Sequence, residues 1–177
     1  MPAKHPKALP YLFFSEMWER FGYYLMIGIF LLYLKNVEQG FAMTNAEASD
    51  LYGTFIALVF LTPFLGGLLA DRYFGYRKSI ITGGIMMGAG YCLMAIHSLP
   101  MLYISMTLVI IGNGFFKPNI STLLGNLYST PQFIDRKDDG YNIFYMGINV
   151  GAFICNFFSA AIIIVWGWKY AFIAAGI

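Results

Sequence analysis

Charged side chains are scarce in this sequence, and long hydrophobic runs take their place. Of its 177 residues, 11% are charged and 59% are hydrophobic, whereas a soluble domain usually carries about 25% charged residues. The composition therefore predicts an integral membrane protein surrounded by a lipid bilayer. The net charge is +2, and no basic run accompanies it, so nucleic acid is not an expected partner.

Cysteine and histidine are equally rare, with two residues of each. Cys92 and Cys155 lie in apolar stretches, which predicts two small buried side chains and neither a disulfide nor a metal site. His97 stands beside Ser98 and Pro100 at the expected end of a helix. An intramembrane hydrolase needs a nucleophile and a base within reach, so this setting does not favour an enzyme.

Six apolar segments predict an all-α, multi-pass membrane protein. They span about residues 11–34, 51–70, 79–96, 101–127, 141–165 and 169 onward. Each complete segment is close to the ~20 residues that cross a bilayer core. The last one stops about nine residues in, without a flanking charge, so we expect the sequence to end inside a sixth helix.

Basic residues gather on alternate connections. If the N-terminus is cytoplasmic, seven lie inside and two lie outside, which is the bias expected of cytoplasmic loops. The inner residues are Lys4, Lys7, Arg72, Arg77, Lys78, Arg136 and Lys137, and the outer residues are Lys35 and Lys169.

Three charges interrupt the first apolar segment, in EMWERFGYY. On a helix, Glu16 and Arg20 lie about 40° apart and Glu19 lies about 60° to one side. Tyr23 and Tyr24 fall within the same arc of about 140°. An inert ion pair between helices is one explanation, but intramembrane ionisable residues more often mark a functional site.

The fourth segment contains a mid-helix cation, in GNGFFKPN. Lys117 shares a face with Asn113 and Ser121, and Pro118 frees a backbone carbonyl and permits a bend. Such a bend should be covered by protein or line a wet cavity. The alternative is that Lys117 snorkels to the cytoplasmic surface.

Two weaker patterns complete the set. The fifth segment has a polar stripe, beside Gly147 and Gly151 in a GxxxG spacing that is typical of helix packing. The stripe consists of Asn142, Tyr145, Asn149 and Asn156. The short inner connection, residues 66–80, predicts a conformational latch of charges at helix ends, or an ordinary basic loop. The latch would involve Asp71, Arg72, Arg77 and Lys78.

These motifs together resemble the N-terminal half of the proton-dependent oligopeptide transporters of the major facilitator superfamily. The helix-one motif ExxERFxYYG, the inter-helix motif of residues 66–75, the FKPN motif and FYMGINVGA follow one another in the family's order, with GWKYAF after them. The resemblance implies that residues 1–177 form one bundle, with five complete helices and part of a sixth. A second, C-terminal bundle would then complete a central cavity.

The resemblance also implies roles for individual residues. Protons would be the coupling ion, no other cofactor would be needed, and the substrate would be a di- or tripeptide. Proton coupling would involve Glu16, Glu19, Arg20 and Lys117, with Lys117 facing the acids across the cavity. Substrate would be contacted by Arg20, Tyr23, Tyr24, Lys117 and Asn149. Gating would involve Asp71, Arg72, Arg77, Lys78 and Pro118.

Three positions depart from the family pattern. Leu25 stands where the helix-one motif ends in glycine, Phe60 where a cavity tyrosine is common, and Gly53 where animal members have a histidine. The absence of that histidine and the FKPN motif resemble bacterial members, which implies an inner-membrane location. Nitrate or another small solute is the alternative cargo, because nitrate carriers share the helix-one motif. A channel and a non-transporting structural subunit remain the other classes.

Overall fold

The computed structural model describes residues 5–177, and within them the chain is helical with no strand. The helices are α1 (Leu9–Lys35), α2 (Asn45–Leu69), α3 (Tyr76–Met94), α4 (Leu99–Leu127), α5 (Lys137–Trp166) and α6 (Trp168–Gly176). A π-helical turn, η1 (Ala70–Phe74), continues α2, and a 3-10 turn, η2 (Ile134–Arg136), precedes α5. The predicted all-α fold is confirmed.

The helices coincide with the six apolar segments, but α2 and α5 begin earlier than the hydrophobic runs. Thr44 caps α2 in a capping box with Glu47, whose backbone N–H donates to the Thr44 hydroxyl. Asp138 and Asp139 lie in the first turn of α5, where carboxylates interact favourably with the helix dipole. Capping therefore extends each helix into polar sequence that a hydropathy pattern does not mark.

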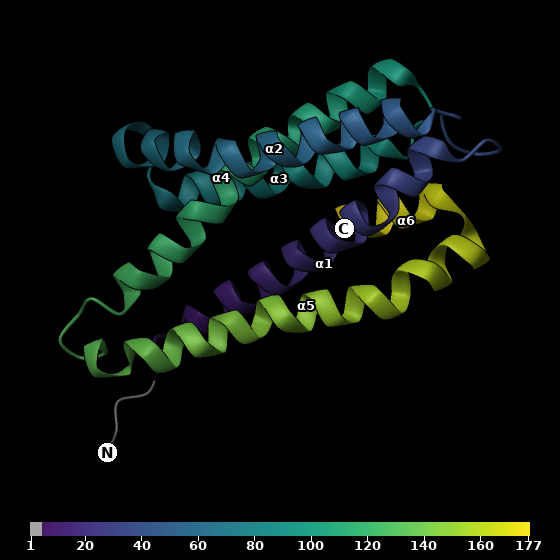
Figure 1. The fold of residues 1–177 in the computed structure, drawn as a ribbon. Coiled ribbons are helices and arrows are strands. Elements are labelled where there is room, and N and C mark those ends of the chain that lie inside the picture. Colours follow the sequence, from purple (N-terminus) through teal and green to yellow (C-terminus); the bar gives the residue numbers. More distant parts are fainter. Residues whose placement is uncertain (1–4) are drawn as a thin grey trace.

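The six helices form two layers, with α2, α3 and α4 in one and α1, α5 and α6 in the other (Figure 1). Within the layers, α4 packs against both α2 and α3, and α5 packs against α1. The short α6 contacts α3, α1 and α5, so it joins the layers. The last turns of α4 run away from α2 and α3 toward the start of α5 (Figure 1).

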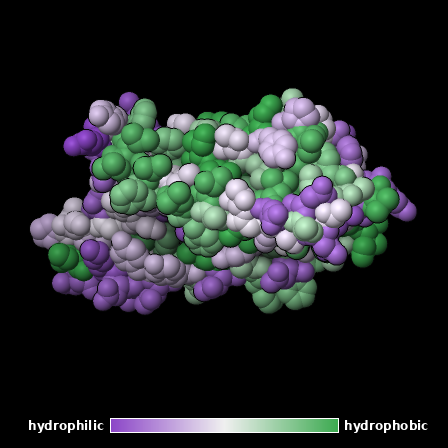
Figure 2. All heavy atoms as spheres, turned by 45° about the horizontal axis from the view of Figure 1, so that its top comes forward, coloured by the Kyte–Doolittle hydropathy of each residue, from purple (hydrophilic) through white to green (hydrophobic). Residues whose placement is uncertain are grey.

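Much of the surface is apolar. Hydrophobic residues gather over the middle of the face in Figure 2, and hydrophilic ones are mostly toward its ends. Three stretches are long and apolar enough to cross a membrane: Asn45–Phe74, Leu99–Leu127 and Ile134–Trp166. By these measures α1 and α3 do not qualify, because α1 carries the predicted charge cluster and α3 is shorter and rich in glycine.

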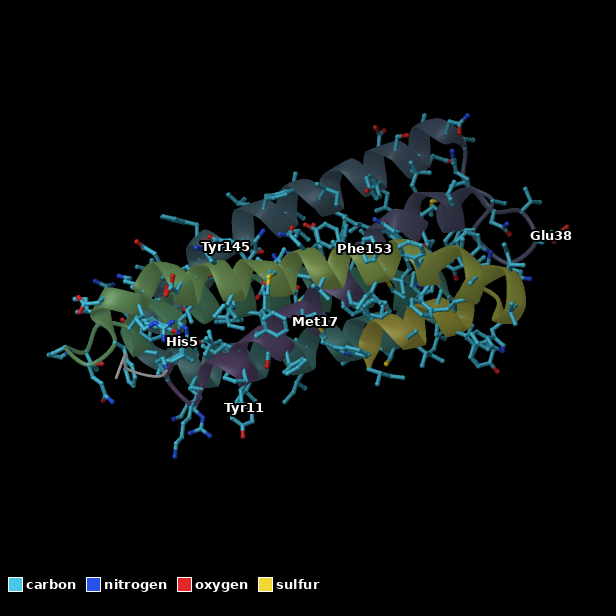
Figure 3. The ribbon with its side chains drawn as sticks, turned by 90° about the horizontal axis from the view of Figure 1, so that it is seen from below. His5, Tyr11, Met17, Glu38, Tyr145 and Phe153 are labelled. Atoms are coloured by element: carbon cyan, nitrogen blue, oxygen red, sulfur yellow. The ribbon has the colours of Figure 1, made fainter. Side chains whose placement is uncertain are left out.

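Glycines allow the closest helix approaches. A Cβ atom added to Gly151 would lie 2.2 Å from the Met17 carbonyl oxygen, and one added to Gly147 would lie 3.0 Å from the Phe13 carbonyl oxygen. Figure 3 shows Met17 where α1 and α5 lie together. The GxxxG pair therefore serves helix packing, as predicted, and the structure shows that α1 is the partner. Gly75 makes the tight turn between η1 and α3 with a φ of 74°. Residues with a side chain rarely adopt this positive-φ conformation.

One sequence prediction about the core is wrong. Cys155 is buried at 2% exposure, as expected, but Cys92 is exposed, and both thiols are free. Helical periodicity alone did not fix which face of α3 turns outward, because α3 is apolar on several sides.

The connections alternate between the two ends of the molecule (Figure 1). One end holds the start of α1, η1 and the connection from α4 to α5, and therefore Lys7, Arg72, Arg77, Lys78, Arg136 and Lys137. The opposite end holds Lys35 and Lys169. Lys4 lies outside the described residues. The predicted charge asymmetry is thus present, and the side of the membrane on which each end lies stays a prediction.

Gly151→Ala should destabilise the protein by about 1–3 kcal/mol, because the added methyl group overpacks the contact between α1 and α5. The measurement is the unfolding temperature in detergent. Gly53→Ala is the matched control, since a Cβ atom there meets nothing within 4 Å. Equal unfolding temperatures for the two variants would contradict this close packing.

Candidate functional site

The centre of α1 holds a buried three-residue charge cluster. The Arg20 Nε atom lies 3.2 Å from a Glu16 carboxylate oxygen, and it also donates a hydrogen bond to Glu19. The side chains of Glu16 and Arg20 are each 4% exposed, and that of Glu19 is 7% exposed. The predicted shared face is confirmed, and one guanidinium serves both acids.

The cluster is unbalanced in charge and in hydrogen bonds. Two carboxylates share one cation, and three atoms have no partner: Glu16 Oε2, Glu19 Oε1 and Arg20 Nη2. Buried charges are costly unless they are paired and their remaining hydrogen-bonding positions are filled. A proton on one acid, a second cation or a substrate with complementary groups would each reduce that cost.

The two tyrosines after the cluster occupy different environments. Tyr23 is 5% exposed, and the Arg20 guanidinium carbon lies 5.0 Å from its ring centroid. Tyr24 is half-buried and makes an edge contact with Tyr23, with centroids 5.6 Å apart. Tyr23 therefore supports Arg20 from within the bundle, and Tyr24 is the more accessible of the two.

Lys117 is half-buried on α4 and forms no ion pair with either acid of α1 in the described structure. Its Nζ atom instead lies 5.2 Å from the ring centroid of Phe60, on α2. An aromatic face attracts an ammonium group, with a benefit of about 0.5–1 kcal/mol at exposed sites. The expected direct pairing of Lys117 with Glu16 or Glu19 is thus not present in this conformation.

Pro118 lies inside a continuous α4, and α2 covers the backbone that proline disturbs. The carbonyl of Gly114, four residues earlier, lies so close to Gly66 that an added Cβ atom would be 2.0 Å from its oxygen. The Asn113 amide donates to the Val59 carbonyl at 2.9 Å. Asn119, which the sequence patterns did not single out as a site, donates to the Gly66 carbonyl of α2 at 3.4 Å and to the Phe115 carbonyl of α4 at 2.7 Å. These contacts tie α4 to α2 and steady its proline turn.

The polar stripe of α5 is open to the surroundings. Asn142, Tyr145, Asn149 and Asn156 are all exposed, and Figure 3 shows Tyr145 and Phe153 along α5. Asn149 is therefore free to meet a substrate or another part of the transporter, as its predicted role requires.

The predicted latch residues lie together at one end of the bundle. Asp71, Arg72, Arg77 and Lys78 are all exposed, and among residues 5–177 no ion pair within 4.0 Å joins Asp71 to the three basic side chains. The exposed basic groups are thus placed where another part of the protein could meet them.

A residue that sequence reasoning missed lies behind the cluster. Tyr91, on α3, is 2% exposed, and its hydroxyl has no partner. It lines a cavity of about 240 Å³ together with Glu19, Ser15, Trp18 and residues of α4 and α6. A single tyrosine in an apolar segment has no periodic partner, so the sequence offered little signal for it.

Metal and nucleophile sites find no support in the part of the chain that is described. No group of three histidine, cysteine or acidic side chains there could hold a metal ion. His97 lies 3.3 Å from the Gln39 carbonyl and stacks on Phe41, with centroids 4.8 Å apart. It occupies a helix connection far from the charge cluster in sequence and serves local packing.

Comparison with known proteins identifies the family. A family model described as "Major Facilitator Superfamily" matches residues 20–177. The chain belongs to the Major Facilitator Superfamily. An uncharacterized transporter, YclF of Bacillus subtilis (strain 168), is 40% identical over 153 residues, or 85% of this chain and 31% of its own length.

Peptide transporters are among the other matches. A di-/tripeptide transporter of Lactococcus lactis subsp. lactis (strain IL1403) is 39% identical, over 84% of this chain and 31% of its own length. A crystal structure of a POT peptide transporter variant in complex with alafosfalin has a TM-score of 0.92 and 36% identity, covering 99% of this chain and 37% of that one. The resemblance to this branch is confirmed, and the chain is a multi-pass membrane protein. It spans about a third of the length of these relatives.

Arg20→Gln should lower the unfolding temperature strongly, because it leaves two buried carboxylates without their cation. Removing one partner of a buried pair typically costs about 3–5 kcal/mol. The triple variant Glu16→Gln, Glu19→Gln, Arg20→Gln removes all three charges and should unfold closer to the wild type. If the single and triple variants unfold at the same temperature, the ion pairs do not carry this stability.

Proposed function

We propose that this chain is the N-terminal bundle of a proton-coupled symporter for di- and tripeptides. Residues 1–177 supply one side of a central cavity, and a C-terminal bundle of the same transporter supplies the other. The observation that carries the proposal is the buried cluster in which Arg20 alone balances Glu16 and Glu19. The relatives named as peptide transporters support the choice of substrate.

The proposed mechanism follows from competition for Arg20. A peptide ends in a carboxylate, which binds a guanidinium or an ammonium group well. When this carboxylate draws Arg20 toward the cavity, with Lys117 as a second binding group, one acid of α1 loses its counter-charge. That acid then takes a proton, since an isolated buried carboxylate is costly. Peptide and proton are therefore bound together and released together.

The second cation is positioned to take part in this exchange. Lys117 is held by the Phe60 ring and not by an acid, so its ammonium group does not have to leave a carboxylate to meet a substrate. Tyr24 and the exposed Asn149 supply further polar contacts to the peptide, and Tyr23 keeps Arg20 in place. Rocking of this bundle against the other would expose the cavity to each side in turn.

The proposed orientation places the N-terminus and the basic end of the bundle in the cytoplasm of a bacterial cell, with the protein in the inner membrane. This follows the positive-inside tendency. Asp71, Arg72, Arg77 and Lys78 then face the cytoplasm, where they would form and break contacts between the helix ends as the cavity opens and closes. Pro118, with α2 packed over its turn, would let α4 adjust in the same step.

Nitrate or another small anion is the second candidate cargo, because Arg20 and Lys117 would also bind a compact anion. Competition separates the two: excess nitrate should leave uptake of labelled dipeptide unchanged if peptides are the cargo. A structural subunit without transport is excluded if the complete transporter accumulates dipeptide.

Lys117→Ala in the complete transporter should abolish accumulation of dipeptide against its gradient, while exchange of dipeptide down its gradient persists. Without Lys117, Arg20 is the one cation of this bundle near the acids, so peptide binding and proton uptake no longer occur in step. Both modes are measured in the same proteoliposomes, with and without an imposed pH gradient.

Lys117→Arg and Phe64→Leu are the two controls for this experiment. Arginine keeps the charge but not the compact ammonium group, so it should restore accumulation poorly. Phe64 is exposed one helical turn from Phe60, so its replacement should leave both modes near wild type. Accumulation of several-fold by Lys117→Ala would assign proton coupling to other residues.

A further inference from the structure

Tyr91 and Glu19 are two buried polar groups that each lack a hydrogen-bonding partner. The Tyr91 hydroxyl and the Glu19 Oε1 atom are both buried and unpartnered, and Arg20 occupies the other oxygen of Glu19. Buried polar groups in native structures are nearly always hydrogen-bonded, so each exception calls for an explanation.

The packing of α3 against α1 brings these two groups into one site. The Tyr91 ring lies beside Gly22, where an added Cβ atom would be 3.5 Å from Tyr91 Cε2. Gly22 and Glu19 are three residues apart on α1 and therefore share a face. The carbon that contacts Gly22 is next to the carbon that bears the hydroxyl, so the hydroxyl end of Tyr91 lies beside the part of α1 that carries Glu19.

A cavity beside both groups gives them room to meet. Its volume is about 240 Å³, and Glu19 and Tyr91 both line it. Side chains change between staggered rotamers at modest cost, so a rotation of Glu19 into this space is open to it. A cavity of this size, with the polar groups of Glu19 and Tyr91 on its wall, also accommodates a bridging water.

We propose that Tyr91 is a positioning residue for the Glu19 carboxyl group: its hydroxyl is the partner that the Glu19 Oε1 atom reaches by turning into the cavity, and it becomes the main partner of Glu19 when Arg20 turns toward a substrate. A hydroxyl suits both states of the acid, because it donates a hydrogen bond to the carboxylate and accepts one from the protonated carboxyl. No proton leaves Tyr91 in this arrangement. Tyr91 holds Glu19 in place while the proton arrives from water and departs to water.

Among residues 5–177, four charged or titratable groups surround this pair. Glu16, Arg20 and Tyr23 come from α1, and Lys117 comes from α4. The part of α6 that lines the cavity is Ala175 and Gly176, followed by Ile177, and none of these titrates in its side chain. These four groups are unchanged in Tyr91→Phe, so a pH shift in that variant can be assigned to the lost hydroxyl group.

The test is Tyr91→Phe, which removes the hydroxyl and keeps the ring. Hydrogen bonds to an ionised acceptor are about twice as strong as neutral ones, so the loss disfavours the carboxylate of Glu19 more than the acid. The pH profile of dipeptide accumulation should move by about half to one pH unit toward alkaline pH. Exchange at the wild-type optimum should stay within about twofold of wild type.

Tyr33→Phe is the matched control. Tyr33 is also buried, at 3% exposure, but it packs against Phe41, Trp168 and Phe172 and lies about 21 Å along α1 from Glu19. The pH profile of dipeptide accumulation by Tyr33→Phe should coincide with that of the wild type. An unshifted profile for Tyr91→Phe, or the same shift in both variants, would overturn the inference.

A second measurement keeps this inference separate from the proposed function, on which the transport test rests. The unfolding temperature of the purified protein is recorded against pH for wild type, Tyr91→Phe and Glu19→Gln. Tyr91→Phe should shift the curve of unfolding temperature against pH toward alkaline pH, even if the protein transports no dipeptide. In the Glu19→Gln background the same replacement should cause no shift, and a shift that persists there would assign it to another group.

Discussion

The structure depends on one buried guanidinium that two carboxylates share. Arg20 lies in the bundle between Glu16 and Glu19, and Tyr23 lies against it. Removing Arg20 leaves two buried carboxylates without a counter-charge, which is far more costly than losing a surface ion pair. Because the cluster has one negative charge too many, it responds to protons and to groups that compete for Arg20.

The surrounding helices make this cluster possible. α5 packs on α1 through Gly151, directly beside Met17 and Arg20, and α6 approaches α1 at Gly22 so closely that an added Cβ atom there would lie 2.4 Å from the Ala175 carbonyl oxygen. These contacts bury the charges within the bundle. α1 therefore lies between the other helices and also carries the groups that are proposed to respond to substrate. Protonation of Glu16 or Glu19, or movement of Arg20, would therefore affect how α1 packs against its neighbours.

The sequence predicted the helices, the charge cluster and the GxxxG contact, because each leaves a periodic or compositional signal within a single segment. It did not predict that Lys117 rests on Phe60, that Cys92 is exposed, or that Tyr91 lies behind Glu19. Those facts depend on how α2, α3 and α4 are rotated about their axes, and long-range packing sets that rotation. The peptide contacts proposed for Tyr24 and Asn149 depend in addition on a second bundle, so they remain predictions.

The most direct test of the central claim follows protons and peptide at the same time. The complete transporter is reconstituted in liposomes with equal pH on both sides, a clamped membrane potential, and a pH-sensitive dye and a low concentration of unlabelled dipeptide in the lumen, and an excess of labelled dipeptide is added outside. Wild-type protein should acidify the lumen as dipeptide enters. Glu19→Gln should admit dipeptide by exchange without acidification. Peptide entry without any proton movement in the wild type, or undiminished acidification with Glu19→Gln, would contradict the account.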